Sequence, residues 1–517
     1  MSNLFDYRVR TANAEPLDMT DVLEVEEGLS ERVDELLAVR PTGHSLVRNQ
    51  LSFIRTIALS VGIQGPVAGV IVGPAVLASI VGGGGALAYL FGFIAMAFVA
   101  YAFVIFSREF NSAGSVYAFN GSALGPTFGF ASAWILMLVY VSFAGAVYAS
   151  TADISQSLLD SFGVHVWWVW LALAGFVLTM LFAYFSIAYS SIVIFICEGV
   201  AVLLIAVVGI AVLAKGGYHH HAFSGSPFTT HGVALGVLGL GVVNAFGAFS
   251  GFEGAATLGE ESRRSTRTIP LAIALSLIGS AAVYIVFTWI ADNAYASPAA
   301  LAADPAPFVH LATANIGAWM GKAVNIAGVI SAFGAQLACI NAANRLVFAL
   351  GREVGGSTGR LSGFLTSTSQ KTSSPIGALV VTGGASIAAL LAFGFEATAI
   401  RALILIVEFG AYLIVIAYLL TVIAAVAWVW RHSRNVFPLA VLSIGVAVLG
   451  YVLYVTFYPF PAAPFDWVVL VALTSALLGV LIARTPQIRG RLAHSELLRA
   501  TKRAAPTVQV AAGGNVV

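Results

Sequence analysis

Long runs of apolar residues alternate with short polar segments along most of the chain. A helix that crosses the hydrocarbon layer of a bilayer needs about 20 mostly apolar residues. The runs also lack the two-residue alternation that indicates the strands of a membrane barrel. Twelve runs have a suitable length, at 52–78, 86–107, 128–151, 166–186, 191–213, 233–258, 271–291, 323–350, 376–393, 398–430, 438–457 and 465–483. The pattern predicts an all-α integral membrane protein with twelve transmembrane helices.

Composition excludes several other classes of protein. The 517 residues are 59% hydrophobic and only 9% charged, whereas soluble domains carry about 25% charged residues. The 25 basic side chains balance 24 acidic ones, so nucleic acid is not expected as a partner. No Walker A sequence or H-E-x-x-H metal motif occurs. We therefore expect neither an ATP-driven pump nor an enzyme, and no cofactor or metal site.

The basic residues orient the predicted helices. If the N-terminus lies in the cytoplasm, all but three of the 25 Lys and Arg residues fall on the cytoplasmic side, the exceptions being Lys215, Lys322 and Arg401. Such an excess in cytoplasmic loops is the usual arrangement of helical membrane proteins. We therefore expect a multi-pass protein of the plasma (inner) membrane with both termini in the cytoplasm.

Two predicted helices are interrupted near their middles. In segment 52–78, Pro66 removes a backbone donor, and Gly62, Gly65 and Gly69 loosen the backbone around it. Segment 233–258 is glycine-rich from Gly247 onward. Non-helical backbone is tolerated in a membrane where protein or a water-filled cavity satisfies it, although glycine also marks close helix packing. The matched positions predict two repeats of opposite topology with a substrate site at the midplane.

These repeats divide the chain into five parts: a polar N-terminal tail at 1–51, two five-helix repeats at 52–213 and 233–430, two extra helices within 438–483 and a basic C-terminal tail at 484–517. In a site of this kind, the N-termini of half-helices face an anionic group and freed carbonyls face a cation. A small zwitterion with one carboxylate and one ammonium group fits both ends.

Several segments resemble motifs of the amino acid–polyamine–organocation (APC) superfamily of transporters, in the order that the superfamily shows. They are 111–119, similar to "AGGxYxY"; Glu260-Glu261 with 267–270, similar to "EE…PxRxIPxAI"; 341–353, similar to "NAxSRxLYAxxRDG"; and 371–375, similar to "KTxxP". The resemblance implies a LeuT-type fold. It also implies secondary transport of amino acids or related amines, either coupled to protons or by exchange.

The resemblance also implies a set of substrate-binding residues. Val67-Ala68-Gly69 stand at the family's "GSG" turn, which receives the substrate carboxylate, and only the last glycine matches. Segment 249–253 matches "FxGFE", where the carbonyls of Gly247 and Ser250 would receive the amine. The predicted residues are Gly65, Pro66, Val67, Ala68, Gly69, Phe246, Gly247, Phe249, Ser250, Gly251 and Phe252. The three phenylalanines are either aromatic lids or ordinary helix packing.

Glu198, Glu253 and Glu408 are carboxylates inside predicted helices. A buried carboxylate costs about 2.5–3.5 kcal/mol at a helix centre on insertion scales, and we interpret all three as candidate proton carriers. Some family members place a lysine near the position of Glu198, beside a cation site, so coupling to protons or to sodium stays open. Glu253 has a second interpretation, as a brace for the interrupted turn.

The interpretation of two other polar residues also stays open. Glu408, near Tyr412, either faces a cationic group of the substrate or packs as a neutral acid. Ser331, in segment 323–350, is either a packing residue among small neighbours or a cation ligand.

Taken together, these features predict a secondary active transporter that moves an amino acid or related amine by alternating access. Its expected partners are this small substrate, a proton or sodium ion, and the bilayer. A membrane sensor that binds the ligand without moving it is an alternative. A channel is another, although no potassium-selective filter sequence is present. The particular substrate, the choice between symport and exchange, and the oligomeric state are not predicted.

Overall fold

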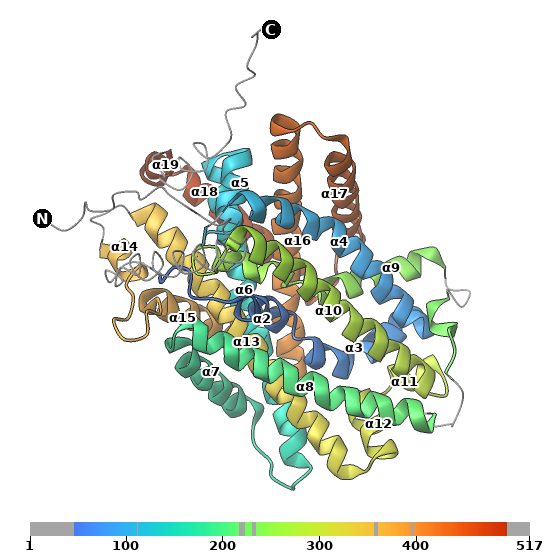
Figure 1. The fold of residues 1–517 in the computed structure, drawn as a ribbon. Coiled ribbons are helices and arrows are strands. Elements are labelled where there is room, and N and C mark those ends of the chain that lie inside the picture. Colours follow the sequence, from blue (N-terminus) through green and yellow to red (C-terminus); the bar gives the residue numbers. More distant parts are fainter. Residues whose placement is uncertain are drawn as a thin grey trace, which may run out of the picture.

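The computed structural model describes residues 46–110, 112–216, 223–229, 234–355, 360–393 and 398–493. Within these ranges the chain forms a bundle of helices (Figure 1), without a named strand and with two isolated bridges, Leu51–Ser262 and Thr368–Pro375. Residues 1–45 and 494–517, which hold most of the two predicted tails, lie outside the described residues, as does Asn111 of the first motif segment.

Each predicted apolar run falls on helix in the structure. The helices that carry these runs are α2 (Phe53–Gln64), α3 (Pro66–Val81), α4 (Gly85–Glu109), α6 (Pro126–Asp160), α7 (Trp168–Tyr184), α8 (Ile187–Lys215), α9 (Leu235–Ala248), α10 (Ser265–Ala294), α13 (Ala318–Gly355), α15 (Ile376–Phe393), α16 (Ala399–His432), α17 (Val436–Phe457) and α18 (Phe465–Arg484). Shorter elements between them are η1 (Gly82–Gly84), α5 (Val116–Leu124), η2 (Ser226–Phe228), η3 (Phe252–Leu258), α11 (Pro298–Ala302), α12 (Pro307–Asn315), α14 (Arg360–Leu365) and α19 (Pro486–Ala493).

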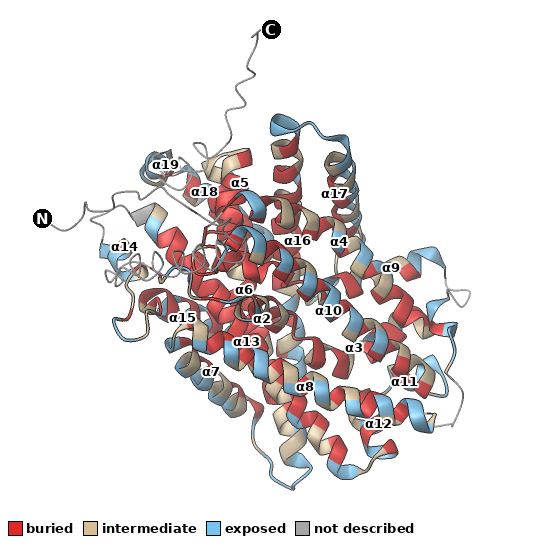
Figure 2. Ribbon diagram, in the orientation of Figure 1, coloured by how far each residue is buried: buried red, intermediate tan, exposed pale blue. Residues whose placement is uncertain are grey.

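The described residues contain nine helical segments that are long and apolar enough to cross a membrane. The first of them, Phe53–Glu109, includes α2, α3 and α4, and two more apolar helices, α7 and α15, are shorter. Large apolar side chains on the outside of the bundle are exposed, for example Leu203 and Ile210 of α8. This pattern, pale blue and tan outside and red inside in Figure 2, is expected where lipid is the solvent.

The helices α6 and α13 form the centre of the bundle. In each, 72% of the most apolar window is buried inside the protein, against 22% in the peripheral helix α17. α6 packs on both α13 and α16, while α2 packs on α8, α10 and α13. Of the two interrupted elements, α2, α3 and η3 pack on α13, while α9 packs on α3 and α4.

Candidate functional site

The first interruption lies between α2 and α3. Gly65 connects the two helices at φ +49°, in the left-handed region that glycine adopts at little cost. Pro66 is the first residue of α3, a position where a helix has no need of the missing backbone donor. The Gly65 N–H closes α2 by donating to the carbonyls of Val61 (3.1 Å) and Gly62 (3.0 Å). The sequence thus produces two short helices joined by one glycine.

Tyr284 of α10 supports this interruption. Its hydroxyl donates to the carbonyl of Gln64 at 3.0 Å, so the last carbonyl of α2 is satisfied although the helix does not continue. A Cβ on Gly69 would lie 2.6 Å from the same hydroxyl, so glycine is needed there for the tyrosine to fit. Tyr89 stacks on the ring of Tyr284 with centroids 5.0 Å apart.

A chain of hydrogen bonds links the start of α3 to Glu198 of α8. The Ala68 N–H donates to Oγ of Ser331 on α13 at 3.2 Å, and Ser331 donates in turn to the Glu198 carboxylate at 3.0 Å from Oε2 and 3.1 Å from Oε1. Glu198 is 4% exposed and Ser331 is fully buried. The charge state of this carboxylate is therefore connected, through one hydroxyl group, to the backbone of the first interruption.

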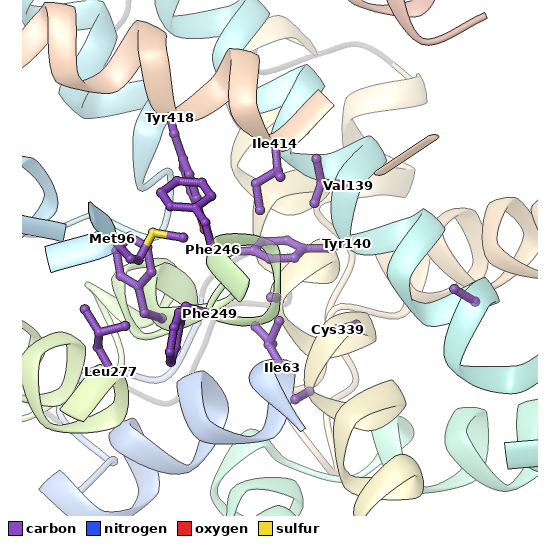
Figure 3. Packing of buried hydrophobic residues seen from close by; sticks show 14 of the residues in the cluster. Ile63, Met96, Val139, Tyr140, Phe246, Phe249, Leu277, Cys339, Ile414 and Tyr418 are labelled. Atoms are coloured by element: carbon purple, nitrogen blue, oxygen red, sulfur yellow. The ribbon is translucent and has the colours of Figure 1, made fainter. Parts of the chain in front are cut away.

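The second interruption follows α9, where Gly251 takes φ +110° before the 3-10 segment η3. It packs directly on the first. A Cβ on Gly251 would lie 2.4 Å from Cγ2 of Ile63 and 3.2 Å from the backbone nitrogen of Gln64, and a Cβ on Gly254 would lie 2.4 Å from Cδ1 of Ile63. Figure 3 shows Ile63 at the end of α2 facing the turn that follows Phe246 and Phe249. Gly251 must be glycine because of these contacts and its positive φ, whereas at Gly254 a side chain would displace only the terminal methyl group of Ile63.

Ser60 of α2 ties the two interrupted elements together. Its hydroxyl donates to the carbonyl of Phe252 at 2.7 Å and accepts from the N–H of Ala255 at 2.8 Å. Both backbone groups belong to η3, a segment that lacks the hydrogen-bond pattern of an α-helix. The serine therefore satisfies backbone that would otherwise be unpaired in the bundle interior.

Glu253 braces the second interruption. Its fully buried carboxylate accepts from Tyr140 of α6 at 2.9 Å, from Tyr418 of α16 at 2.6 Å and from the N–H of Gly251 at 3.0 Å. The three donors satisfy both oxygens of this buried carboxyl group. Tyr140 and Tyr418 appear on either side of Phe246 in Figure 3. This geometry corresponds to the structural interpretation of Glu253, and proton coupling through this residue remains a proposal.

The three predicted phenylalanines are buried. Phe249 meets the rings of Tyr89 and Tyr284 edge-on, with centroids 6.0 and 5.5 Å apart. Phe252 packs at 5.3 Å from Phe103. The phenylalanines are therefore buried beside the two interruptions, whereas Gly247 is exposed on α9.

Glu408 lies apart from the contacts that join the interruptions. It is half-buried on α16, and its interaction partner is Tyr412, one turn further along the same helix. No hydrogen bond within the described ranges connects it to Gly65 or Gly251. The structure thus brings the end of α2, at Ile63 and Gln64, together with Gly251 and places Glu198 and Glu253 beside the two turns.

Sequence reasoning missed Gln64, Ser60, Tyr284 and Tyr418. Gln64 is 6% exposed; its Nε2 donates to the Ser60 carbonyl at 3.3 Å, and its Oε1 has no hydrogen-bond partner. A buried glutamine directly before Gly65-Pro66 is the one signal in the sequence that marks this position. The other three are common residue types in ordinary helical surroundings.

The acidic and basic motif residues pair at one end of the bundle. Arg345 of α13 contacts Glu261 through two hydrogen bonds, Nε to Oε2 at 3.0 Å and Nη2 to Oε1 at 3.3 Å, with both side chains 2% exposed. Arg352 pairs with Glu260 at 2.7 Å and is more exposed. Burial alone would raise the pKa of Glu260, but the hydrogen bond and charge of Arg352 outweigh it and hold this pKa below its usual range. These pairs fasten the loop after η3 to α13.

The fold and the site define a multi-pass helical membrane protein with two interrupted helices in contact inside the bundle. Residues 51–481 match the model of a family described as amino acid permease. The chain belongs to this family, which is part of the APC superfamily.

Several characterised transporters are similar to the chain. It is 26% identical over 348 residues to the methylthioribose transporter of Bacillus subtilis (strain 168), covering 62% of this chain and 70% of the relative. It is 26% identical over 361 residues to the low-affinity putrescine importer PlaP of Escherichia coli (strain K12), covering 67% and 74%. It is 24% identical over 285 residues to the branched-chain amino acid permease BcaP of Bacillus subtilis (strain 168), covering 53% and 60%. Family and relatives together show a transporter and not an enzyme.

Proposed function

We propose that this protein is a secondary active permease that moves an amino acid or related amine across the plasma membrane by alternating access. The observation that carries the proposal is the contact of Ile63 with Gly251, where two interrupted helices meet inside the bundle. Interrupted helices in membrane transporters mark the substrate site. The relatives named for putrescine and for branched-chain amino acids support both substrate classes.

The proposed architecture has twelve spans. In this count α2–α3 is one span and α4 is another, and the shorter helices α7 and α15 are also spans. Each predicted apolar run is then one crossing. Residues 52–213 and 233–430 then form two five-helix repeats of opposite topology, in which α2–α3 corresponds to α9–η3, and α17 and α18 are the two additional helices. Both termini lie in the cytoplasm in this arrangement, as the distribution of Lys and Arg indicates.

We assign coupling first to Glu198. The hydrogen bonds Glu198–Ser331–Ala68 give its carboxylate a direct connection to the first interruption. Uptake or release of a proton there changes whether Ser331 must donate to the carboxylate, and so changes the partner available to the Ala68 N–H. Glu253, already held by three donors, ranks second, and Glu408 third.

The test is uptake of radiolabelled amino acids and amines by proteoliposomes that contain the purified protein. We expect saturable uptake that an inwardly directed proton gradient drives, together with counterflow when unlabelled substrate is placed inside. Glu198→Gln should remove the stimulation by the gradient. An unchanged proton dependence in Glu198→Gln, Glu253→Gln and Glu408→Gln would refute proton coupling by these residues.

The same experiment separates the alternatives. Binding without uptake or counterflow would indicate a sensor, and flux that does not saturate would indicate a channel. Stimulation by a sodium gradient in place of a proton gradient would assign sodium to the site beside Glu198. Counterflow without any response to either gradient would indicate exchange.

A further inference from the structure

Around the two interruptions most hydrogen-bond donors are already paired, while one buried acceptor, Gln64 Oε1, has no partner. We propose that the substrate of this permease is an organic amine without an α-carboxylate, and that its ammonium group binds at Gln64 Oε1. This inference rests on the proposed transport function and narrows the substrate within it.

The turn that would receive a carboxylate has few free donors. Pro66 has no N–H, the Gly65 N–H closes α2, and the Gly69 N–H donates to the Gly65 carbonyl at 3.0 Å. The Ala68 N–H is occupied by Ser331. Only the Val67 N–H of this turn lacks an acceptor among the described residues. A desolvated carboxylate needs several donors to be stable, and one amide does not supply them.

The second interruption adds one side-chain donor, the hydroxyl of Ser250, which is buried without a hydrogen-bond partner; its other named donors are occupied. The Gly251 N–H is held by the carboxylate of Glu253, and the N–H groups of Phe249 and Ser250 donate to the carbonyls of Phe246 and Gly247, both at 3.1 Å. The hydroxyls of Tyr140 and Tyr418 are also directed at Glu253. These donors are thus held by Glu253 or by backbone carbonyls, and the Ser250 hydroxyl is the one left for a substrate carboxylate.

Acceptors, in contrast, remain. Gln64 Oε1 is buried without a hydrogen-bond partner, and its backbone nitrogen lies at the contact with Gly251, between the interruptions. Glu198 accepts from Ser331 alone among the described side chains. A buried acceptor without a donor is costly, and an ammonium group supplies three donors with a positive charge.

The charge of the two elements agrees with this assignment. From 53 to 81 and from 235 to 258, the one basic residue is Arg55, in the first turn of α2, while Glu253 lies at the second interruption and Glu198 beside the first. A substrate carboxylate would find no basic side chain in the core of these two elements to pair with it. An ammonium group would instead find two acids that can accept its hydrogen bonds.

Matched pairs of compounds test the inference, because decarboxylation of ornithine gives putrescine and that of lysine gives cadaverine. Each compound competes for counterflow in proteoliposomes with the full-length protein. We expect each diamine to compete at least tenfold more strongly than its parent amino acid. Isobutylamine against valine extends the comparison to an apolar side chain.

Variants at Gln64 locate the ammonium site. Gln64→Leu removes the acceptor and should weaken competition by the diamines at least tenfold, while Gln64→Glu keeps an acceptor and should retain it. Gln336 is the control: this buried glutamine of α13 is bonded to Thr151 and to the Gly175 carbonyl. Gln336→Leu should lower the thermal midpoint and leave the preference for diamines unchanged.

The outcomes are distinguishable. Uptake of ornithine, lysine or valine as strong as that of their amines would overturn this inference and leave the permease function intact. A diamine preference that Gln64→Leu preserves would overturn the assignment of the ammonium site. If none of the six compounds is taken up or shows counterflow, both this inference and the proposed function fail.

Discussion

Ile63 and Gly251 touch where the two interrupted helices meet, so closely that a Cβ on residue 251 would lie 2.4 Å from Cγ2 of Ile63. Their separation in the sequence is large, yet this contact sets the spacing between α2 and η3. Gly251 also has φ +110°. This position therefore needs glycine for two reasons, the absence of a side chain and the left-handed backbone conformation.

Gly251→Ala should therefore destabilise the protein by about 1–3 kcal/mol, from backbone strain and overpacking together. It should also reduce uptake, because the two interruptions are forced apart. Thermal unfolding of the purified protein and proteoliposome uptake measure the two effects. Gly236→Ala is the control, since a Cβ at this α9 position meets no atom within 4 Å. Equal midpoints for the two variants would contradict the prediction.

The hydrogen bonds from Tyr140 and Tyr418 to Glu253 predict that removing either hydroxyl group destabilises the protein. Tyr418→Phe removes the 2.6 Å hydrogen bond and should cost about 1–3 kcal/mol, the usual range for leaving a buried polar group without its partner. Tyr140→Phe should have a similar effect, and combining either change with Glu253→Gln should add less than the sum of the single effects. Tyr189→Phe, at an exposed position on α8, serves as the control. Additive effects in the double-mutant cycle would show that no coupling exists.

Ser331→Ala should weaken the coupling of transport to protons without abolishing transport itself. Without its hydroxyl, Glu198 and the Ala68 N–H lose their common partner, so stimulation of uptake by a proton gradient should fall severalfold while counterflow at equal pH persists. Ser331→Thr keeps the hydroxyl and should restore the stimulation. Ser190→Ala is the matched control, a buried serine of α8 bonded to the Phe182 carbonyl. An identical loss in both alanine variants would point to packing alone.

The two arginine pairs should differ in strength because they differ in burial. Arg345→Gln leaves the buried Glu261 unpaired and should cost about 3–5 kcal/mol. Arg352→Gln affects a pair whose arginine side chain is 36% exposed, and should cost no more than about 1 kcal/mol. Denaturation of both variants under identical conditions provides the comparison. A larger loss in Arg352→Gln would show that burial is not the deciding factor.

The pair Glu260–Arg352 also predicts a pH dependence. Because the pKa of Glu260 is lower in the folded protein than in the unfolded chain, its stabilising contribution is complete above the ordinary glutamate pKa of about 4.3. The contribution is lost as the pH falls through the lower folded value. The difference in thermal midpoint between the wild type and Glu260→Gln should therefore shrink from pH 7 towards pH 3. A difference that stays constant would contradict this assignment.

Local chemistry explains what sequence reasoning identified correctly. The apolar runs coincide with helices because a long apolar segment in lipid must satisfy its own backbone. Gly65-Pro66 marks the first interruption, since proline cannot donate and glycine readily takes φ +49°. The APC motifs identified the family that the comparisons show.

Residues whose importance arises from distant partners were not predictable in this way. Nothing near Gln64 in the sequence indicates that its carbonyl accepts from Tyr284, 220 positions away, or that its side-chain oxygen lacks a donor. The sequence left Glu253 with two interpretations, and its partners Tyr140 and Tyr418 are 113 and 165 positions away. The proximity of Glu408 to Tyr412, by contrast, could be predicted because the two residues are one helical turn apart.

The amino-acid sequence by itself determined the class of protein, its helical segments and the place of the first interruption. These depend on hydrophobicity and on the backbone of single residues, which act over one or two turns of helix. Only the tertiary structure decided which polar groups are paired and which are left with unused hydrogen-bonding capacity. That outcome depends on side chains from α6, α8, α10, α13 and α16 arriving at the two turns, because a hydrogen bond forms only when donor and acceptor are brought within about 3 Å.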